Sequence, residues 1–398
     1  MKKTIKELDI YISDGNYSSK YPRSEEFVEE GIPFIRGNNM VDGDITDDEM
    51  YYITPEKHSL LLKGHVKAGD VLITTRGNIG QVAIVPDRHE DSNINAQIVL
   101  LRTNQETLYN RYLLWALQSH GANEQYLALQ TGTALKQLPV GKLEKLFIEV
   151  TDINKQHEIA DILDKTYEVV KLRRKELQLL DDLIKARFVE MFGDPKINPF
   201  NWNVVNISQI VSGKVSNGFF ARRDDYCDDG NVGVLGVANI VNRMYSKIEE
   251  LPRTNANDED IKKFEVKYGD MLFCRSSLVA EGIGKASIIP KNIQRNILFE
   301  CHVIRLPLDL KICIPEFIQT LSTMNFFRNQ IIAQSKTATM TTIGQDGILK
   351  ADIILPPIEK QKDFYNFVHQ VDKLKLQVQK SLDETQILFD SLMQQYFG

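Results

Sequence analysis

The stretch VKAGDVL, at residues 66–72, occurs a second time as VKYGDML at residues 266–272. The two copies lie 200 positions apart, and further matches follow in the same order. These further matches are Val85-Pro86 with Ile289-Pro290, Lys155-Gln156 with Lys360-Gln361, and Met191-Phe192-Gly193 with Tyr396-Phe397-Gly398. The offset drifts only from 200 to 205, which a few loop insertions explain. Repetition on this scale indicates that the chain contains two copies of one fold.

Each half follows the same plan. It begins with about 150 residues in which short strand-like runs, such as residues 71–74 and 97–101, alternate with Gly, Asn and Asp turns. A short helical stretch follows, at residues 109–119 and 315–323, and then one long helix, Ile153–Phe192 or Ile358–Phe397. The predicted divisions are domains at 1–150 and 194–355, and helices at 151–193 and 356–398.

The long helices carry a heptad pattern with alternating spacings of four and three residues. The positions are Ile159, Leu163, Thr166, Val170, Arg173, Leu177, Leu180, Ile184, Arg187 and Met191, and Phe364, Val368, Val371, Lys375, Val378, Leu382, Thr385, Phe389, Leu392 and Tyr396. A sustained period of 3.5 residues predicts coiled-coil packing. Because the stripes fall at equivalent places, we expect the helices to pair antiparallel within one chain. A compact bundle and a dimerisation coil are the alternatives.

The predicted fold is therefore of the α+β class. Two similar mixed α/β globules are separated by two long helices that form an antiparallel intrachain coiled coil, giving a pseudo-two-fold dumbbell. Such a chain suits a pseudo-two-fold target, and duplex DNA is a common target of this kind.

Composition agrees with a globular protein but does not by itself predict its partner. Hydrophobic residues make up 42% and charged residues 26% of the chain. The formal charge is −6 and the pI about 5.8, which is unlike a simple basic DNA-binding domain. Local charge on one face can still support DNA binding. No signal peptide, membrane helix or CxxC pair is recognisable, so a cytoplasmic, reduced protein is expected.

Catalytic motifs are incomplete wherever they begin. The segment at 279–286 has valine and alanine where a phosphate-binding loop requires glycine and serine or threonine. Asp258 and Asp260 precede a Glu-Val-Lys like that of some nucleases, but the first half has His65 in place of Glu265. An Asn-Pro-Phe at 198–200 lacks the second proline of a methyltransferase motif, and no histidine has metal-ligand or triad spacing. These absences favour a binding protein over an enzyme.

Several motifs, in this order and in both halves, resemble the specificity subunits of type I restriction–modification systems. They are MFGDP at 191–195 with Asn198-Pro199 and Trp202, GIPFIRG at 31–37 with GVLGVAN at 233–239, GDVLI at 69–73 with RGNIG at 76–80, and LPPIEKQ at 355–361. The resemblance covers nearly the whole chain. In the second half, Arg275 is followed by two serines and not by the glycine that follows Arg76.

The resemblance implies a non-catalytic reader of a two-part DNA site. Each globule would be a target-recognition domain for one half-site, and the helices would set the spacer and hold two methyltransferase subunits. Those subunits would bring S-adenosylmethionine, and restriction subunits docked through them would bring ATP and magnesium. The chain itself would hold no cofactor and no metal. A coiled-coil scaffold without DNA binding, and a self-contained nuclease or methyltransferase, are the rival hypotheses.

Candidate DNA contacts are loop residues whose side chains can read base edges or bind phosphates. In the first half they are Ser18, Lys20, Arg36, Asn38, Asn39, Thr75, Arg76, Asn78, Thr133, Lys136 and Gln137. In the second half they are Arg222, Arg223, Asn239, Arg243, Arg275, Ser276, Lys336, Thr339, Thr341 and Thr342. We expect Arg76 to correspond to Arg275, and the loop at 133–137 to correspond to that at 337–342. The alternative for each position is a solvated loop residue.

Overall fold

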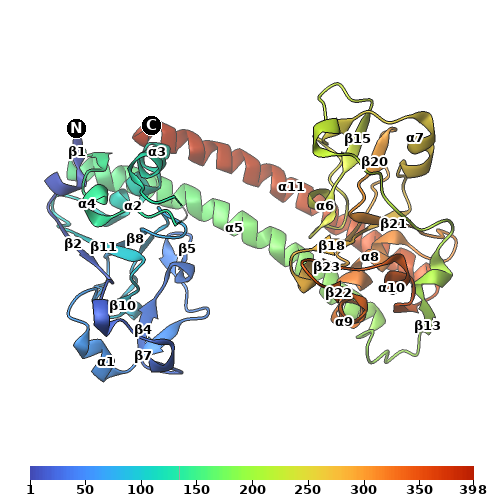
Figure 1. The fold of residues 1–398 in the computed structure, drawn as a ribbon, viewed down its shortest axis with the longest axis horizontal. Helices are drawn as coiled ribbons and strands as arrows, with labels where there is room; N and C mark the ends of the chain where they lie inside the picture. The colour runs from blue at the N-terminus through green and yellow to red at the C-terminus, as the bar shows by residue number, and fades with distance from the viewer. Residues whose placement is uncertain (134) are drawn as a thin grey trace. The chain divides into compact units, whose positions relative to one another are not determined.

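The computed structural model describes residues 1–133 and 135–398, and the chain forms two compact units. Unit 1 consists of Met1–Arg174 together with Lys380–Gly398, and unit 2 is the continuous segment Lys175–Gln379. Both marked ends of the chain therefore lie in unit 1 (Figure 1). Each unit combines strands, short helices and a segment of both long helices, which confirms the predicted α+β class and the repeated plan.

Unit 1 contains two four-stranded sheets. The first has the order β2 (Ile10–Asp14), β11 (Ile98–Thr103), β8 (Val71–Thr74), β9 (Val82–Ile84), with all pairs antiparallel. The second has the order β10 (Asn93–Ile94), β4 (Ile32–Ile35), β7 (Tyr51–Ile53), β3 (Phe27–Val28), and its β10–β4 pair is parallel. Two small pairs complete the unit: β1 (Lys2–Thr4) with β12 (Phe147–Glu149), and β5 (Met40–Val41) with β6 (Asp44–Ile45).

Unit 2 repeats this topology. Its first sheet has the order β14 (Ser216–Asn217), β21 (Val303–Pro307), β17 (Asp270–Cys274), β19 (Ala286–Ile288). Its second has the order β16 (Arg253–Thr254), β15 (Val232–Leu235), β20 (Ile297–Phe299), with β15 and β20 again parallel. The pair β13 (Asn203–Asn206) with β24 (Asp352–Leu355) matches β1 with β12. A further small sheet joins β18 (Ser276–Ser277), β23 (Thr341–Thr342) and β22 (Lys336–Thr337).

The repeated VKxGDxL stretch forms the same turn in both units. Gly69 and Gly269 have φ of +86° and +94°, a conformation that glycine adopts without strain. The carboxylate that follows each glycine accepts the backbone N–H three residues earlier, at 2.8 Å for Asp70 and 2.9 Å for Asp270. Asp70 and Asp270 are both buried, so this bond satisfies a group that would otherwise be costly to bury. The turn therefore explains why the strongest repeat in the sequence precedes the central strands β8 and β17.

Short helices cover these sheets. In unit 1, α2 (Asn110–Gln118) buries six consecutive residues between the sheet and the long helices, where Trp115 contacts Tyr167 and Phe389, and α3 (His120–Leu129) follows it. In unit 2, α8 (Pro315–Thr323) and α9 (Asn325–Gln334) take the same places. The other short α-helices among the described residues are α1 (Pro55–Leu60) and α4 (Val140–Leu143) in unit 1, and α6 (Val237–Ile240), α7 (Asp258–Phe264) and α10 (Gln345–Leu349) in unit 2.

The long helices have the predicted bounds, α5 at Ile153–Phe192 and α11 at Ile358–Phe397. Neither contains glycine or proline, so nothing in the sequence interrupts the helical hydrogen bonds. The first ends where Gly193, at φ +76°, donates its N–H to the Val189 carbonyl at 2.8 Å. All twenty predicted heptad positions are buried or half-buried, which confirms the apolar stripe on each helix.

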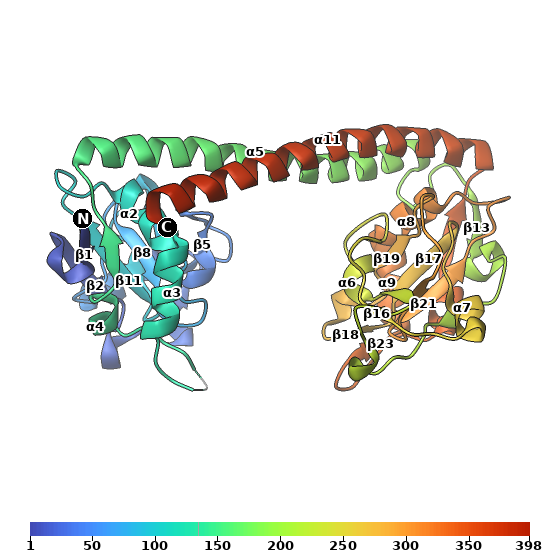
Figure 2. The same cartoon turned by 90° about the horizontal axis from the view of Figure 1, so that it is seen from above.

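Each unit contains a paired segment of the two helices (Figures 1 and 2). In unit 1 the Tyr167 and Phe389 rings lie 5.2 Å apart, and Arg174 donates to Gln386 at 3.1 Å. In unit 2 the same pairing continues between other residues: Phe188 contacts Phe364 at 5.5 Å, and Lys375 bonds Asp181 at 2.6 Å. In both units residue numbers rise along α5 as they fall along α11. This confirms antiparallel pairing within one chain over the alternatives.

Within the residues described, no helix has an apolar stretch long enough to cross a lipid bilayer.

Candidate nucleic-acid interface

The loop after β8 is a rigid turn that presents Arg76 and Asn78. The Gln81 N–H donates to the Thr74 hydroxyl at 3.0 Å. The Gly80 N–H donates to the Thr74 carbonyl, also at 3.0 Å. A Cβ on Gly80, which has φ +87°, would lie 2.6 Å from the Tyr126 ring. Glycine is therefore required where the loop passes over α3. Arg76 and Asn78 are exposed at the tip of this turn.

A second loop pairs with this turn. Thr131 and Gln137 exchange backbone hydrogen bonds at 2.8 and 2.9 Å, which pairs the two ends of this loop. Gln137 also forms a β-bridge with Arg76, and Leu138 donates its N–H to the Thr75 carbonyl at 2.8 Å. We call residues 75–80 and 131–138 the paired loops of unit 1. They bring the predicted contacts Arg76, Lys136 and Gln137 onto one surface.

Unit 2 has the same arrangement in residues 275–284 and 336–343, the paired loops of unit 2. Ser276 pairs with Thr342 in β18 and β23, and Ile343 donates its N–H to the Arg275 carbonyl at 3.0 Å. In Figure 2, β18 and β23 lie toward the end of unit 2 opposite α11. The predicted correspondence between the two Ser/Thr/Lys-containing loops therefore agrees with the hydrogen bonds of both units.

The predicted correspondence of Arg76 with Arg275 is wrong by one residue. The carbonyl that accepts from the second paired loop belongs to Thr75 in unit 1 and to Arg275 in unit 2. Thr75 and Arg275 also donate to equivalent carbonyls, those of Gln97 and His302, at 2.7 and 2.8 Å. Arg76 therefore corresponds to Ser276. Arg275 is half-buried and donates to the Cys301 carbonyl at 3.3 Å, whereas Arg76 is exposed.

Two further loops reach the same end of each unit. A Cβ on Gly15 would lie 2.2 Å from the Asn95 carbonyl oxygen, and one on Gly218 would lie 2.2 Å from that of Glu300. The backbone at Gly15 therefore lies close to the residue that follows β10, and the backbone at Gly218 lies close to the residue that follows β20. The predicted contacts Ser18 and Lys20, and Arg222 and Arg223, follow these two glycines within five residues. A Cβ on Gly37 would lie 3.3 Å from the Thr74 methyl group, so this loop also passes close to the last residue of β8.

The predicted contacts differ in exposure. The exposed ones are Ser18, Lys20, Asn38, Arg76, Asn78, Thr133, Lys136, Gln137, Arg222, Arg223, Arg243, Lys336, Thr339 and Thr342. The half-buried ones are Arg36, Asn239, Arg275 and Ser276. The buried ones are Asn39, Thr75 and Thr341. The second loop of unit 1 also contains Ala134, which lies outside the described residues.

The three buried candidates, and the half-buried Asn239, use their polar side-chain atoms for hydrogen bonds within the protein. Asn39 accepts the Arg36 N–H at 3.1 Å and donates to the Asp48 carbonyl at 2.9 Å. Asn239 repeats this in unit 2, with the Gly236 N–H at 3.0 Å. Thr75 donates its hydroxyl to the Gln97 carbonyl at 3.1 Å, and the Thr341 hydroxyl lies 3.0 Å from that of Thr337. Their polar atoms hold the loops in shape, so they are not available to a nucleic acid in this structure.

Arg36 is also held by its surroundings. Its guanidinium lies 3.5 Å from the centre of the Tyr51 ring and donates to the Glu49 carbonyl. A cation stacked on an aromatic ring in this way is fixed in orientation. The predicted DNA contact at Arg36 would require this stacking to be given up.

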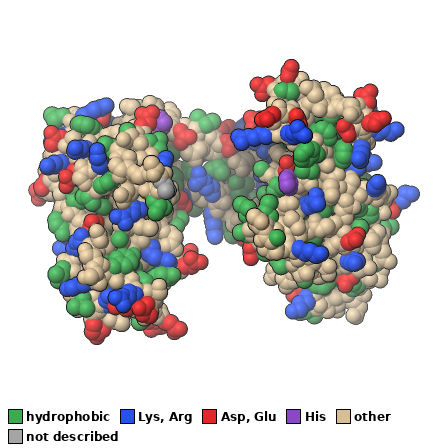
Figure 3. Space-filling view, viewed as in Figure 1, with side chains coloured by type: hydrophobic (Ala, Val, Ile, Leu, Met, Phe, Trp, Pro, Cys, Tyr) green, Lys and Arg blue, Asp and Glu red, His purple; other side chains and the backbone are tan. Residues whose placement is uncertain are grey.

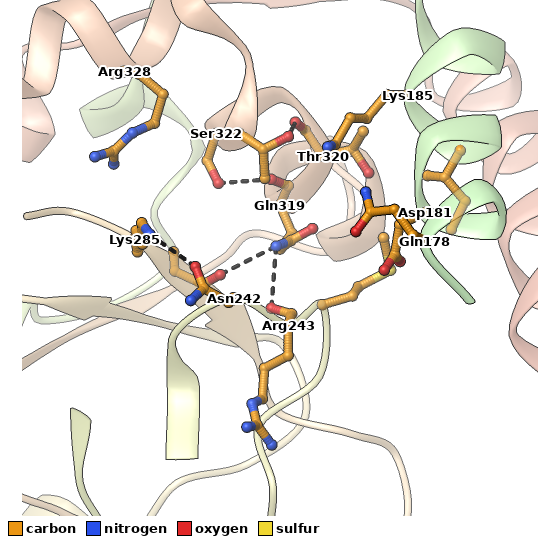
Figure 4. Close-up of a pocket in the computed structure, with 14 residues that line it drawn as sticks. Gln178, Asp181, Lys185, Asn242, Arg243, Lys285, Gln319, Thr320, Ser322 and Arg328 are labelled. Atoms are coloured by element: carbon orange, nitrogen blue, oxygen red, sulfur yellow. Dashed lines mark hydrogen bonds between the residues drawn. The ribbon is translucent and has the colours of Figure 1, made fainter. Parts of the chain in front are cut away.

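Arg243 does not belong to the paired loops. It lines a cavity of about 410 Å³ in unit 2, between the Gln178–Lys185 part of α5 and the α8 region. Figure 4 shows that the Arg243 carbonyl accepts from Gln319, at 3.3 Å, while its guanidinium points away from Gln319. Lys285 bonds Asn242 at 2.8 Å on the same wall. The cavity gathers cations beside the helix and adjoins the paired loops of unit 2, because Arg328 on its wall donates to the Glu281 carbonyl at 3.0 Å.

Charge on the surface is mixed. In Figure 3 the Lys and Arg side chains are interspersed with Asp and Glu on both units. This agrees with the net charge of −6 and means that any nucleic-acid contact depends on local groups such as those of the paired loops.

Sequence reasoning missed exposed apolar residues on these loops. Leu135 in unit 1 and Leu278 in unit 2 are 87% and 82% exposed, and both lie within the paired loops. An apolar side chain that projects among polar loop residues can contact a thymine methyl group or enter a base step. The signal was present in the sequence, as leucine inside an otherwise polar loop.

The incomplete catalytic motifs have structural explanations. A Cβ on Gly284 would lie 2.3 Å from an Ile331 methyl group, so this glycine packs against α9 where a phosphate-binding loop would need open backbone. Asp258 and Asp260 form the first turn of α7, where Asn257 caps the helix by accepting the Asp260 N–H at 2.8 Å. Carboxylates at that position are favoured by the helix dipole.

Comparison with known proteins gives a consistent result. The family model described as type I restriction modification DNA specificity domain matches residues 9–181 and again residues 199–385. The type I restriction enzyme EcoKI specificity subunit of Escherichia coli K12 is 20% identical over 392 residues, covering 92% of this chain and 82% of that protein. The MjaVIII specificity subunit of Methanocaldococcus jannaschii is 21% identical over 379 residues, covering 91% and 81%.

The fold is also found in a solved structure. The S subunit of a type I restriction–modification system from M. genitalium aligns over 100% of this chain and 96% of its own, with a TM-score of 0.56. At 14% sequence identity this likeness concerns the fold alone.

Proposed function

The chain belongs to the type I restriction–modification DNA-specificity family and is a specificity subunit of such a system, and from this premise we propose that each compact unit reads one half of a bipartite DNA site. The family model matches twice, once in each half, and the rival hypothesis of a scaffold without DNA binding has no support among the comparisons.

One observation carries the proposal: the paired loops have the same backbone connections in both units but different side chains. Arg76 pairs with Gln137 of the second loop in unit 1, and Ser276 pairs with Thr342 at the equivalent position in unit 2. Arginine can bind guanine through two hydrogen bonds, whereas serine is less selective. Two copies of one scaffold with different reading groups are suited to two different half-sites. Ser18, Lys20, Arg222 and Arg223 are suited to phosphate contacts beside them.

The long helices are the proposed docking surface for partner subunits and the proposed ruler between half-sites. Outside the heptad stripe, the part of α5 in unit 2 exposes Leu179 and Leu183, whose spacing of four residues places them on one face. Exposed apolar residues grouped in this way mark protein–protein contact sites. We assign this surface to two methyltransferase subunits, with restriction subunits joining through them.

The chemistry is assigned to those partners. S-adenosylmethionine would lie on the methyltransferase subunits, which methylate adenine, and ATP and magnesium on the restriction subunits. This chain would act without catalysis and without a nucleotide cofactor. The packed Gly284 and the capped α7 support this, because the two segments closest to nucleotide or nuclease motifs are used in packing.

The function is tested by methylation of a plasmid library with the reconstituted methyltransferase. We expect adenine methylation at a site of two specified halves separated by unspecified bases. Replacing the paired loops of unit 1 with glycine-serine linkers should relax one half only. A single continuous site, or equal relaxation of both halves, would contradict the proposal. Labelled methyl transfer by this chain alone would contradict its non-catalytic role.

A further inference from the structure

Two histidines and an aspartate that belong to neither of the paired loops converge in unit 1. His58 lies in α1, while His65 and Asp91 lie in the loops before β8 and β10. Nε2 of His58 is 3.3 Å from Oδ2 of Asp91, and Nδ1 of His65 is 3.3 Å from Oδ1. One atom from each of the three residues lies within 4.8 Å of the other two. The sequence analysis did not predict this group, because His58 and Asp91 are 33 positions apart in the chain.

In each imidazole ring, the nitrogen that points away from Asp91, which we call the outer nitrogen, is fixed as a hydrogen-bond donor by its partner. Nδ1 of His58 is 2.6 Å from Oδ1 of Asn93, a buried residue whose amide nitrogen donates to the Tyr17 hydroxyl at 3.4 Å. Nε2 of His65 contacts the Leu61 carbonyl oxygen, which can only accept. Both outer nitrogens therefore carry the hydrogen when the rings are neutral.

In the neutral rings, the nitrogens that face Asp91 (Nε2 of His58 and Nδ1 of His65) then carry lone pairs. These lone pairs point at the carboxylate oxygens of Asp91, which also carry lone pairs. This arrangement is unfavourable unless a positive charge lies between them. Two ligands that are each about 2.0–2.1 Å from a tetrahedral zinc ion lie about 3.3 Å from one another, which is the spacing of metal ligands at a single ion. Each imidazole nitrogen lies 3.3 Å from one oxygen of Asp91, Oδ2 for His58 and Oδ1 for His65, so each nitrogen–oxygen separation matches that spacing.

We propose that Nε2 of His58, Nδ1 of His65 and a carboxylate oxygen of Asp91 bind one zinc-type divalent cation. Asn93 and the Leu61 carbonyl act as the outer partners that orient metal-binding imidazoles. Asp91 is 70% exposed and lines, with His65, an open depression of about 560 Å³. Water can therefore occupy the fourth position. This revises the expectation, drawn from the histidine spacing, that the chain holds no metal.

Unit 2 provides an internal comparison. The bridge of His65 with Asn93 corresponds to that of Glu265 with Leu298, which places Asn296 at the position of Asp91. Asp91 and Asn296 share a left-handed backbone, with φ of 59° and 61°. Glu265 accepts the Asn296 N–H directly, at 2.8 Å. In unit 2 the two equivalent loops are therefore connected by a direct hydrogen bond. The three candidate metal ligands are found together only in unit 1 among the described residues.

The cation would tie α1 to the loop before β10. Through Asn93 and Tyr17 this loop is connected to Ser18, one of the predicted DNA contacts. Occupancy would therefore stiffen one edge of the first recognition domain. Metal binding itself does not depend on the proposed function of that domain.

The test uses the full-length chain without a histidine tag, stripped with a chelator and then incubated with zinc chloride. Zinc bound after gel filtration is measured by mass spectrometry, and cobalt chloride gives a visible absorption band as a second readout. We expect one zinc per chain in the wild type. Affinity should fall at least tenfold in His65→Ala and Asp91→Asn, and zinc should raise the unfolding temperature of the wild type but not of these variants.

His120→Ala is the matched control, because His120 is exposed and also lies 3.3 Å from a carboxylate, that of Glu124. It should bind zinc like the wild type. Asp91→Asn keeps the exposed position and a residue that tolerates the left-handed backbone, so it decides the result if His65→Ala does not fold. A wild type that takes up no zinc, or equal uptake by Asp91→Asn and His120→Ala, would overturn the proposal.

Discussion

Gln156 and Gln361, both fully buried, make the same three hydrogen bonds in the two units. Gln156 accepts the Tyr109 N–H at 2.9 Å and donates to the carbonyls of Thr107 and Thr151, at 3.1 and 2.8 Å. Gln361 accepts the Ile314 N–H at 2.9 Å and donates to the carbonyls of Ile312 and Pro356, at 3.2 and 2.8 Å. One side chain thus locks the start of each long helix to the segment before α2 or α8.

Gln361→Ala should destabilise unit 2 because it removes the side-chain partner of one N–H and two carbonyls, of which the Pro356 carbonyl is in a buried bond and the other two groups are in part-buried bonds. We expect a loss of roughly 2–4 kcal/mol in the free energy of unfolding. Urea denaturation followed by circular dichroism measures it. Gln370→Ala, an exposed substitution on the same helix, should cost less than about 0.5 kcal/mol. Equal midpoints for the two variants would show that the bonds contribute nothing.

Arg76→Ala should weaken binding of the reconstituted methyltransferase to its site, because Arg76 is exposed at the tip of the paired loops. If Arg76 binds a guanine, discrimination at one position of one half-site should fall by about 1–3 kcal/mol. Affinities for a panel of single-base variants at fixed salt measure this. Lys145→Ala removes an exposed cation outside these loops and should have little effect. Equal loss in both half-sites would reject the modular assignment.

Deleting seven residues from each long helix, in register, should shorten the spacer and keep both half-sites. One heptad of helix is about 10 Å long, which corresponds to about three base pairs at ~3.4 Å each. Because seven residues preserve the apolar stripe, the helices should still pair. Methylated positions in a plasmid library report the spacer length. A spacer of unchanged length would mean that the helices are not the ruler.

Unit 2 should gain stability on acidification through Glu316. Burial raises the pKa of this carboxyl, and that of Asp372. A raised pKa means that the folded state binds the proton more tightly, so stability falls as pH rises through the folded pKa. The pH range over which this stability is lost therefore lies above the ordinary glutamate pKa of about 4.3. The urea midpoint should therefore rise less between pH 8 and pH 5.5 in Glu316→Gln than in the wild type.

The control for this experiment is Glu359→Gln, since Glu359 is largely exposed at the start of α11. Its pH dependence should follow the wild type. If Glu316→Gln gained as much stability as Glu359→Gln on acidification, burial of Glu316 would not control the response.

Long-period features were predictable from the sequence. The bounds of α5 and α11 follow from uninterrupted heptads, and the turn before β8 from a glycine followed by an acidic residue. The correspondence of Arg76 with Arg275 was wrong because it followed residue type, whereas the strand keeps the offset of 200 set at Asp70 and Asp270. A one-residue shift moves a side chain to the other face of a strand.

Side-chain direction in loops was less predictable. Asn39, Thr75 and Thr341 are short polar residues that serve equally well as nucleic-acid contacts or as partners of nearby backbone. The sequence does not distinguish the two uses, since both favour turns. The group of His58, His65 and Asp91 depends on the packing of α1 against a distant loop, and no local spacing encodes it.

Unit 1 is assembled from two separated stretches of chain, and this has a consequence for synthesis on the ribosome. Phe389 and Phe397 belong to its hydrophobic core, and Phe397 packs on Tyr112 with ring centres 5.1 Å apart. Unit 2 is one continuous stretch. During translation the second recognition unit can therefore complete its fold while the first still awaits residues 380–398. A nascent or proteolysed chain that stops at residue 379 contains every residue of unit 2 but lacks the Phe389 and Phe397 side chains that complete the core of unit 1, so loss of the C-terminal segment affects the N-terminal unit.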